Sequence, residues 1–582
     1  MIAVALGLLG LWSWKRQTGN AVGTPHIEQI TNFIGDEGET APRGIGSPAL
    51  SSDGKLLAFI HDSQLWIKLL PAGEPTQLTH DLSPKFDPAF SPDGAHIAYS
   101  VISRDNSWDT WEIPTFGGEP YLWLPNASGL SWTGPNTVLF SEIKTGMHMA
   151  VVAANTNRTS SRDIYVPPDN RGMAHQSYLS PDRKRILLTE MDRGSWLPCR
   201  VVPADGSSRG TRVGSEKGQC TQAAWSPDGR WMYTTTNASG EQQIWRQAFP
   251  DGVPQQLTFG PSIASGIAVA PDGRSLITYI GFVQHAIFIH DERGDRAITT
   301  QGDSILPGWG DGFPTSIFSH DGSRLYYLLH SGVTRAFGGG ELWVHDFAKG
   351  ANDPVLTGMS VTSFDLSPDG QNIVFSALDQ GSVPRLWMAR LDRRTVPRRI
   401  LPGEARGPVF GRDGAIYFGG PEGSQYFIFA LNPETGVVRK LVADPSVDAP
   451  AVSPDRKWIV VTVPFAGPDT TSLVKAYPIG GGTPVSLCQR CFLKWSGDQQ
   501  ALYVSSNAAN SAGNGKTLVI SLTGGNALPK VPENGLTIES GASIPGAKLL
   551  PLQGLFPGVR RSQYAYVKSL STENLYRVTL PR

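Results

Sequence analysis

A short turn sequence, Ser-Pro-Asp-Gly or a close variant, recurs along almost the whole chain. Intact copies begin at Ser91, Ser226 and Ser367. Neighbouring turn aspartates lie 40 to 49 residues apart, except for one double gap between Asp93 and Asp182. A fixed period of this length is typical of repeat architectures and constrains the fold before any other feature. The turn aspartates are Asp53, Asp93, Asp182, Asp228, Asp272, Asp321, Asp369, Asp413, Asp455 and Asp498.

Each repeat predicts four short β-strands. Pro presets φ near −65°, Asp bonds backbone N–H groups and Gly accepts positive φ, so the turn suits a β-hairpin. Alternating apolar residues follow the turn, as in residues 55–60 and 371–376. An aromatic-bearing strand such as 64–67 comes next, and a Gly-rich turn leads to a last strand such as 73–79. Four short strands every forty-odd residues indicate a β-propeller blade, and the absence of long helical patterns predicts an all-β fold.

The complete pattern resembles the TolB-type β-propeller repeat, and the resemblance covers roughly residues 22–582. In that class the resemblance implies protein–protein contacts at the cell envelope. Propellers of this kind are also similar to the extracytoplasmic sensor part of bacterial membrane regulators. In those proteins a cytoplasmic DNA-binding or kinase domain precedes one transmembrane helix.

Twelve repeats can be counted, which predicts tandem β-propellers with about twelve four-stranded blades. Two rings of six blades are the simplest arrangement; seven plus five is the alternative, and a single ring of twelve is disfavoured. We expect three segments: 1–20 as a membrane anchor or signal segment, 21–295 as a first six-bladed propeller and 296–582 as a second one. The Gly/Pro-rich residues 302–314 are expected to form the linker.

Ring closure gives the sharpest structural prediction. The last repeat ends without an outer strand, and two orphan strands, 26–31 and 296–299, are available to complete a blade. In a sequential arrangement 296–299 pairs with 574–580, and 26–31 pairs with the third strand of the sixth repeat, near 285–290. In an interleaved arrangement 26–31 pairs with 574–580. We favour the sequential arrangement, because neighbours in sequence usually pack as neighbours in space.

Charge and hydropathy bear on partners and localisation. The formal net charge is −1 and no run of five Lys or Arg occurs, which argues against a nucleic-acid-binding surface in these residues. Residues 2–14 are almost continuously apolar and precede Lys15 and Arg16. They would span about 20 Å as a helix, short of the bilayer core, so a signal segment and a truncated anchor both remain open, with a buried core segment as the alternative. We expect the protein at the cell envelope, membrane-anchored or exported to the periplasm.

The chain has four cysteines. In an exported protein Cys199 and Cys220 are expected to form a disulfide between adjacent strands, and Cys488 and Cys491 another. Cys488-Gln-Arg-Cys491 lacks the helix, the second cysteine pair and the nearby histidine that redox or structural zinc motifs need.

No constellation of residues indicates catalysis. The chain contains no Gly-x-Ser-x-Gly nucleophile elbow. The repeated aspartates are interpreted as turn formers, and His285 and His290 are expected to face opposite sides of a strand. The recurring tryptophans, at positions 66, 111, 245, 343 and 387, are expected to pack between blades. We therefore assign no catalytic, cofactor-binding or metal-ligating residue and expect no cofactor.

Two functions fit these observations. The favoured one is a non-enzymatic extracytoplasmic binding, scaffold or sensor protein whose propeller loops and channels contact a protein, peptide or glycan. The alternative is a lyase, lactonase or hydrolase with its active site in a propeller channel. An enzyme would require His and Asp or Glu side chains within about 4 Å of one another at a channel, as hydrogen-bonded catalytic groups are.

Overall fold

The repeated turn folds into a compact hydrogen-bonded unit in this computed structural model. The Ser91 hydroxyl donates to Asp93 Oδ1 at 2.6 Å and accepts from the N–H of His96 at 3.0 Å. Asp93 Oδ1 also accepts from the N–H of Ala95 at 3.0 Å, and Gly94 has φ 71°. These bonds satisfy the backbone groups that a tight turn would otherwise leave unpaired. Eight of the ten aspartates are therefore turn formers, as predicted, because equivalent Ser–Asp bonds occur at Ser51, Ser180, Ser226, Ser319, Ser367, Ser453 and Ser496.

The structure describes residues 25–581 with gaps, and these are 34–47, 82, 103–107, 146–147, 170–171, 193–194, 217, 300–302, 305–314, 331–338, 380–382, 424, 447–449, 465–471, 490, 507–515, 523–525, 533–534, 538–540, 542 and 553. The expected anchor or signal segment 1–20 and most of the expected linker 302–314 lie outside the described residues. Within the described part no helix is long and apolar enough to cross a membrane.

One set of sheets, the first ring, comprises six groups of strands. They are β2 (Ala49–Leu50), β3 (Leu56–His61), β4 (Gln64–Leu69) and β5 (Thr76–Gln77) in blade 1; β6 (Lys85–Phe90), β7 (His96–Ile102), β8 (Trp108–Pro114) and β9 (Tyr121–Leu124) in blade 2; β10 (Ser128–Gly134), β11 (Thr137–Thr145), β12 (His148–Asn155) and β13 (Ser161–Tyr165) in blade 3; β14 (Gly172–Leu179), β15 (Arg185–Asp192), β16 (Ser195–Trp196), β17 (Arg200–Pro203) and β18 (Thr211–Arg212) in blade 4; β19 (Cys220–Trp225), β20 (Trp231–Ser239), β21 (Glu241–Ala248) and β22 (Gln255–Gln256) in blade 5; and β23 (Ile263–Val269), β24 (Ser275–Gly281), β49 (Asn574–Thr579) and β1 (Ile27–Gln29) in blade 6.

The other set, the second ring, also comprises six groups. They are β47 (Phe556–Pro557), β48 (Tyr564–Ser571), β25 (Val283–Asp291) and β26 (Gly294–Ala297) in blade 7; β27 (Asp303–Ser304), β28 (Ser316–Phe318), β29 (Arg324–His330), β30 (Gly340–Asp346) and the first part of β31 (Ala351–Leu366) in blade 8; the second part of β31 with β32 (Asn372–Leu378), β33 (Pro384–Arg390) and β34 (Arg398–Glu404) in blade 9; β35 (Arg406–Phe410), β36 (Ile416–Glu422), β37 (Gln425–Leu431) and β38 (Val438–Lys440) in blade 10; β39 (Ala451–Val452), β40 (Trp458–Pro464), β41 (Ser472–Pro478) and β42 (Val485–Gln489) in blade 11; and β43 (Cys491–Trp495), β44 (Ala501–Ser506), β45 (Thr517–Ser521) and β46 (Lys548–Leu550) in blade 12.

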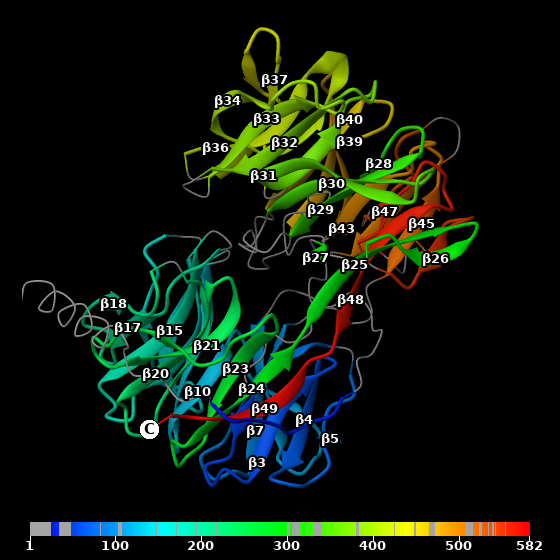
Figure 1. The fold of residues 1–582 in the computed structure, drawn as a ribbon. Helices are drawn as coiled ribbons and strands as arrows, with labels where there is room; N and C mark the ends of the chain where they lie inside the picture. Colours follow the sequence, from blue (N-terminus) through cyan, green and yellow to red (C-terminus); the bar gives the residue numbers. More distant parts are fainter. Residues whose placement is uncertain are drawn as a thin grey trace, which may run out of the picture.

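The strand order makes the protein an all-β tandem propeller. Eight sheets have four strands each; blades 3 and 4 share one nine-stranded sheet and blades 8 and 9 share one eight-stranded sheet. We divide the first of these sheets at its parallel Met149–Met173 bridge and the second within β31, so the count of twelve blades is our interpretation. Figure 1 shows the two lobes that the strands build.

The hydrophobic core lies between blades rather than within them. Each buried cluster joins two consecutive blades, and the series returns to its starting blade in both rings. Leu57 and Phe59 of blade 1, for example, pack with Ile277 and Leu575 of blade 6. Because every blade buries both faces against its neighbours, the rings close without an uncovered sheet face.

The strand pairing shows that the sequential closure is wrong. Ile27 pairs with Val578, and β49 lies between β24 and β1 in blade 6. β26, which overlaps the other orphan strand at residues 296–297, pairs with β25, and β25 pairs with β48. The chain therefore crosses between the rings twice, from β24 to β25 and from β48 to β49, as the green and red strands of Figure 1 show.

The physical reason is the lack of room for a turn. A single residue, Phe282, separates β24 from β25, so these strands continue into one another instead of forming a hairpin. We accordingly propose a revised division in place of 21–295 and 296–582: residues 26–281 with 574–579 for the first ring, and 283–571 for the second.

Candidate functional site

The chain crosses between the rings from β24 to β25 and from β48 to β49, and these two crossings show which ends of the blades are joined. In each blade the Ser-Pro-Asp-Gly-type turn links the first and second strands, and the connections from second to third strand lie at the opposite end. We call this opposite end the loop face. Phe282 leads from the first ring into the second, and residues 572–573 lead back from the second ring into the first, both at this end of blades 6 and 7. The rings are therefore connected through their loop faces, where Thr572 N–H donates to Phe282 O at 3.0 Å.

The innermost strands of the first ring are bulged near the loop face. Register shifts fall between Phe86 and Ala89, between Ser128 and Ser131, between Ala174 and Gln176, between Cys220 and Gln222, and between Ser265 and Ala268. Asp87, Gly129 and Gly266 have φ of 48°, 57° and 78° within these bulges. A bulge leaves backbone groups unpaired in the ladder and redirects side chains, and bulges are frequent beside functional sites.

Gly129 shows how tightly this layer is packed. A Cβ at that position would lie 2.2 Å from the carbonyl oxygen of His175 in the next blade, so only glycine fits. The N–H of Gly129 donates to Ser100 Oγ at 2.9 Å, which ties blade 2 to blade 3. Gln176 Nε2 donates to Asp87 Oδ1 at 2.7 Å and ties blade 4 to blade 2. The bulge layer is thus held in place by bonds between blades.

A layer of buried, uncharged polar side chains lies at the level of the bulges. Ser141, Thr189 and Thr235 on the second strands stand opposite Ser128, Gln176 and Gln222 on the innermost strands. All six side chains are at least 90% buried. We call these residues, with Ser177, the polar layer. Among the residues that the structure describes, no hydrogen-bond partner is found for the oxygens Ser128 Oγ, Ser141 Oγ, Ser177 Oγ, Thr189 Oγ1, Gln222 Oε1 and Thr235 Oγ1.

Such a set is unusual, because nearly all buried polar atoms in proteins are hydrogen-bonded. The atoms come from three consecutive blades, 3 to 5, and they offer hydroxyl and amide groups without a formal charge. This chemistry suits bound water or the polar groups of an uncharged ligand.

Aromatic rings lie beside the polar layer. The ring of His175, within the bulge of β14, lies 4.9 Å from the ring of Trp196 and 5.9 Å from that of Trp108, centroid to centroid. Burial lowers the pKa of His175 to about 4, so its imidazole is neutral at physiological pH. Its Nε2 has no hydrogen-bond partner within the described ranges. The site thus combines a neutral imidazole with two indole faces.

Two carboxylates also lie towards this end of the blades. Asp87 is bonded to Gln176, and Asp192 at the end of β15 is half-buried with Oδ1 unpartnered among the described residues. No group of three or more His, Cys, Asp or Glu that could hold a metal ion is found in the part of the chain that the structure describes.

Two histidine–carboxylate pairs lie outside blades 3 to 5, and the one in blade 1 is on the loop face. His290 Nδ1 lies 3.0 Å from Asp295 Oδ1 on the outer strands β25 and β26 of blade 7, and His61 Nε2 lies 3.6 Å from Asp62 Oδ2 in the β3–β4 turn. His285 and His290 occupy one strand at different registers, opposite Ser569 and Tyr564. The expectation of no catalytic, cofactor-binding or metal-ligating residue remains a prediction.

The tryptophan prediction is confirmed for four positions. Trp66, Trp111, Trp343 and Trp387 pack against clusters that join consecutive blades. Sequence reasoning missed the polar layer, although a signal exists. Ser100, Thr189, Thr235, Ser376, Thr462 and Ser505 each follow the first serine of their turn by nine residues.

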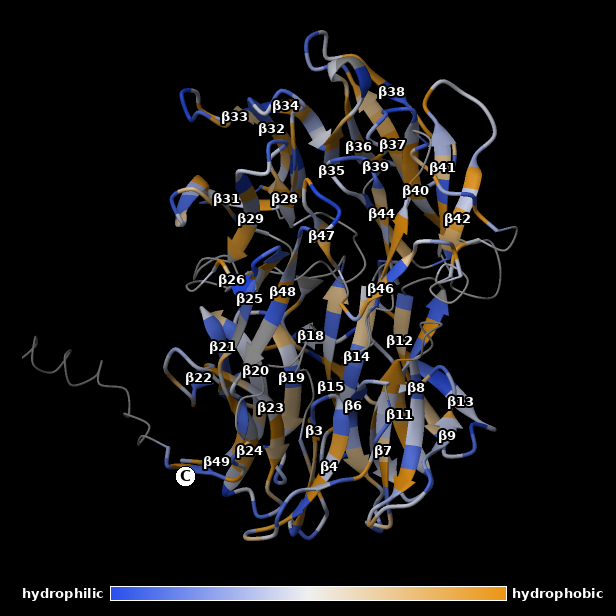
Figure 2. Ribbon diagram, turned by 90° about the vertical axis from the view of Figure 1, so that its right-hand side faces the viewer, coloured by the Kyte–Doolittle hydropathy of each residue, from blue (hydrophilic) through white to orange (hydrophobic). Residues whose placement is uncertain are grey.

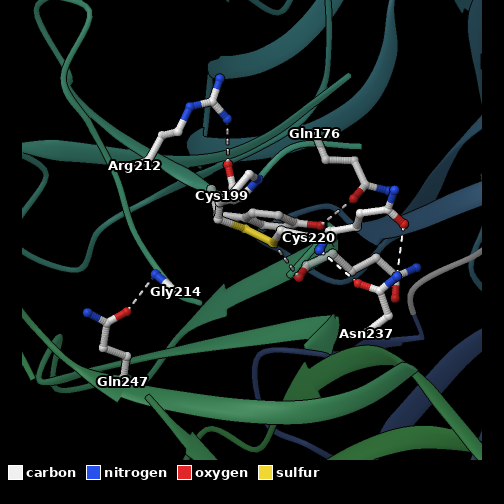
Figure 3. Close-up of a disulfide and its surroundings, with 11 residues drawn as sticks. Gln176, Cys199, Arg212, Gly214, Cys220, Asn237 and Gln247 are labelled. Atoms are coloured by element: carbon white, nitrogen blue, oxygen red, sulfur yellow. Dashed lines mark hydrogen bonds between the residues drawn. A yellow bond between two sulfur atoms is a disulfide. The ribbon is translucent and has the colours of Figure 1, made fainter. Parts of the chain in front are cut away.

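Both expected disulfides are present. Cys199 and Cys220 have Cα atoms 5.3 Å apart, and Cys488 and Cys491 have Cα atoms 6.1 Å apart. Each disulfide joins consecutive blades rather than strands of one sheet: Cys199 directly precedes β17 of blade 4, and Cys220 begins β19 of blade 5. Figure 3 shows the Cys199–Cys220 disulfide among neighbouring polar groups, including Gln176 of the polar layer. Disulfides of this kind persist in oxidising compartments outside the cytoplasm.

These observations define the class of protein: a tandem β-propeller with a polar layer near the loop face of the first ring. The four-stranded sheets agree with the fold that the resemblance to TolB-type propellers implies. Similar solved structures include a putative TolB from Agrobacterium tumefaciens, with 20% identity and a TM-score of 0.34 over 39% of this chain and 86% of that one. They also include the tricorn protease, with 12% identity and a TM-score of 0.32 over 90% of this chain and 62% of that one.

A curated relative is an uncharacterized peptidase, YuxL of Bacillus subtilis (strain 168), which is 22% identical over 211 residues. The match covers 34% of this chain and 30% of the length of that relative. No family model matches the sequence.

Proposed function

We propose that this chain is a non-enzymatic extracytoplasmic binding protein whose ligand contacts the loop face of the first ring. The ligand is a protein, a peptide or a glycan. The observation that carries the proposal is the polar layer, with its buried hydroxyl and amide oxygens lacking partners among the described residues. Binding sites commonly combine a few fixed polar groups with aromatic faces, as His175, Trp108 and Trp196 provide beside this layer.

The location outside the cytoplasm is supported by the two disulfides, which join blades in both rings. The histidine–carboxylate pairs His61–Asp62 and His290–Asp295 belong to blades 1 and 7 rather than to the blades of the polar layer, which favours binding over catalysis at that layer.

Arrays of immobilised peptides and of oligosaccharides test the proposal when probed with the purified, oxidised chain. We expect binding to members of one array, and loss of that binding in the Gln222→Leu variant, because the variant removes the unpartnered oxygen Oε1 from the polar layer. Thr462→Val at the corresponding layer of the second ring is the matched control and should bind like the wild type. Equal binding by Gln222→Leu, or turnover of the bound probe, would contradict the proposal; turnover would favour the enzyme alternative.

A further inference from the structure

The most basic short segment of the described structure lies at the turn between β33 and β34. Residues 390–399 contain five arginines and a single aspartate, whereas the whole chain has a net charge of −1. β33 ends at Arg390 and β34 begins at Arg398, so the connection lies at the end of blade 9 opposite the loop face. Figures 1 and 2 place it on the side of the second ring that faces away from the first ring. We call Arg393, Arg394, Val396 and Arg398 the arginine turn.

Most of this positive charge is not neutralised locally. Asp392 Oδ2 lies 2.9 Å from Arg390 Nη2 and 3.9 Å from Arg394 Nε, so one carboxylate serves two guanidinium groups. Arg399 Nε donates to the backbone oxygen of Leu401 at 3.0 Å. Across the residues that the structure describes, no ion pair involves Arg393 or Arg398. These two exposed arginines and the largely exposed Arg394 are available to an anionic partner.

An apolar side chain lies among these charges. Val396 is 85% exposed. The neighbouring blade 10 repeats the arrangement on the same side, where Val437 is 62% exposed and the exposed Arg439 follows in β38. Arginines around protruding apolar side chains match a lipid surface, where guanidinium groups bind phosphates and the apolar side chain enters between headgroups.

We propose that the arginine turn binds the phosphate-bearing headgroups of an anionic lipid surface and orients the second ring against it. The partner is a lipid surface rather than a nucleic acid, because the two disulfides indicate an oxidising compartment and because base or phosphate contacts along a duplex need no exposed valine. The proposal is independent of the ligand proposed for the first ring, since the turn lies on the opposite end of the other ring.

Co-sedimentation of the purified chain with vesicles tests this directly. Vesicles of phosphatidylcholine alone are compared with vesicles that also contain phosphatidylglycerol. We expect binding to the anionic vesicles only, and a decrease as salt is raised from 0.1 M to 1 M, because the screening length falls from about 10 Å to about 3 Å. Each arginine near the surface contributes about a five-fold factor, so R393Q/R394Q/R398Q should weaken the partition coefficient by on the order of 100-fold.

The control carries the same loss of charge on the first ring, as K55Q/K184Q/R230Q, and should bind like the wild type. V396S should weaken binding by about five-fold while leaving its salt dependence unchanged, because only apolar burial is lost. All these side chains are exposed, so unchanged thermal unfolding shows that the variants fold. Equal losses in both triple variants, binding to neutral vesicles, or tighter binding to a DNA duplex or to heparin than to the anionic vesicles would overturn the proposal.

Discussion

Asn574 joins the two ends of the chain, which makes it the most direct probe of how the first ring closes. Its Oδ1 accepts hydrogen bonds from the N–H of Phe33 at 2.7 Å and from Thr31 Oγ1 at 3.0 Å. Its Nδ2 donates to the carbonyl oxygen of Phe33 at 3.1 Å. Thr31 Oγ1 in turn accepts from the N–H of Leu575 at 2.9 Å. Asn574 is 8% exposed, so water does not readily replace these partners.

Asn574→Ala removes three of these hydrogen bonds. At about 0.5–1.5 kcal/mol for each bond, the free energy of opening β1 from β49 should fall by about 2–4 kcal/mol. Asn574→Asp keeps the Oδ1 acceptor but places a carboxylate oxygen against the carbonyl oxygen of Phe33 at a buried position, so its loss should be at least as large as that of Asn574→Ala.

Hydrogen exchange followed by mass spectrometry is the suitable assay, because a chain with two rings need not unfold in one step and a single melting temperature would mix them. Peptides from β1, β24 and β49 should exchange faster in Asn574→Ala, while peptides from β29 to β45 should be unchanged. The matched control is Asn432→Ala in the second ring, where Asn432 Oδ1 accepts from the N–H groups of Glu434 and Thr435 at 2.9 and 3.0 Å.

The two outcomes separate the closure schemes. Faster exchange confined to the second ring would mean that residues 574–579 belong there, as in sequential closure. Unchanged protection of β1 in Asn574→Ala would mean that the Asn574 contacts do not hold the ring closed. Either result refutes the reasoning.

Three further predictions follow from single features. C199S/C220S should lower the unfolding free energy of the first ring by about 3 kcal/mol in denaturant titrations, because the disulfide closes a loop with a sequence separation of 21. Burial lowers the folded-state pKa of His175 to about 4, so the unfolded chain binds a proton first and stability should fall as the pH drops from about 6.5 to 4; His175→Gln should remove this component. Burial raises the pKa of Glu573 to about 7, so its stabilising contribution is present at pH 4 and lost as the pH rises through 7; Glu573→Gln should be more stable than the wild type at pH 8 and equal to it at pH 4.

Much of the fold could be predicted because its determinants are local. The hydroxyl of Ser91, the carboxylate of Asp93 and the positive φ of Gly94 lie within one tight turn, so their spacing in the sequence reports their geometry. The cysteine pairing was also accessible, since Cys199 and Cys220 lie in consecutive repeats. Whether each disulfide joins two strands of one blade or two consecutive blades was harder to predict, because both kinds of disulfide span similar lengths of sequence.

The polar layer depends on contacts that the repeat period does not reveal. Ser100 bonds to the backbone of the next blade, whereas Thr189 and Thr235 at the same position have no partner among the described residues. A hydroxyl at this position is compatible with both situations. Only the packing of neighbouring blades distinguishes a hydroxyl that bonds to the next blade from one that has no partner among the described residues.

The repeats alone do not show which orphan strand completes which ring. Strands β1 and β26 are equivalent in type, so the pairing preference of their own residues does not decide which blade each completes. The decisive feature lies in the connections. Phe282 alone links β24 to β25, and only Thr572 and Glu573 link β48 to β49, without the Gly, Asn or Asp that tight hairpins favour. At both places the chain lacks a turn, so each strand passes into the other ring, and the two missing turns together enforce the interleaved closure.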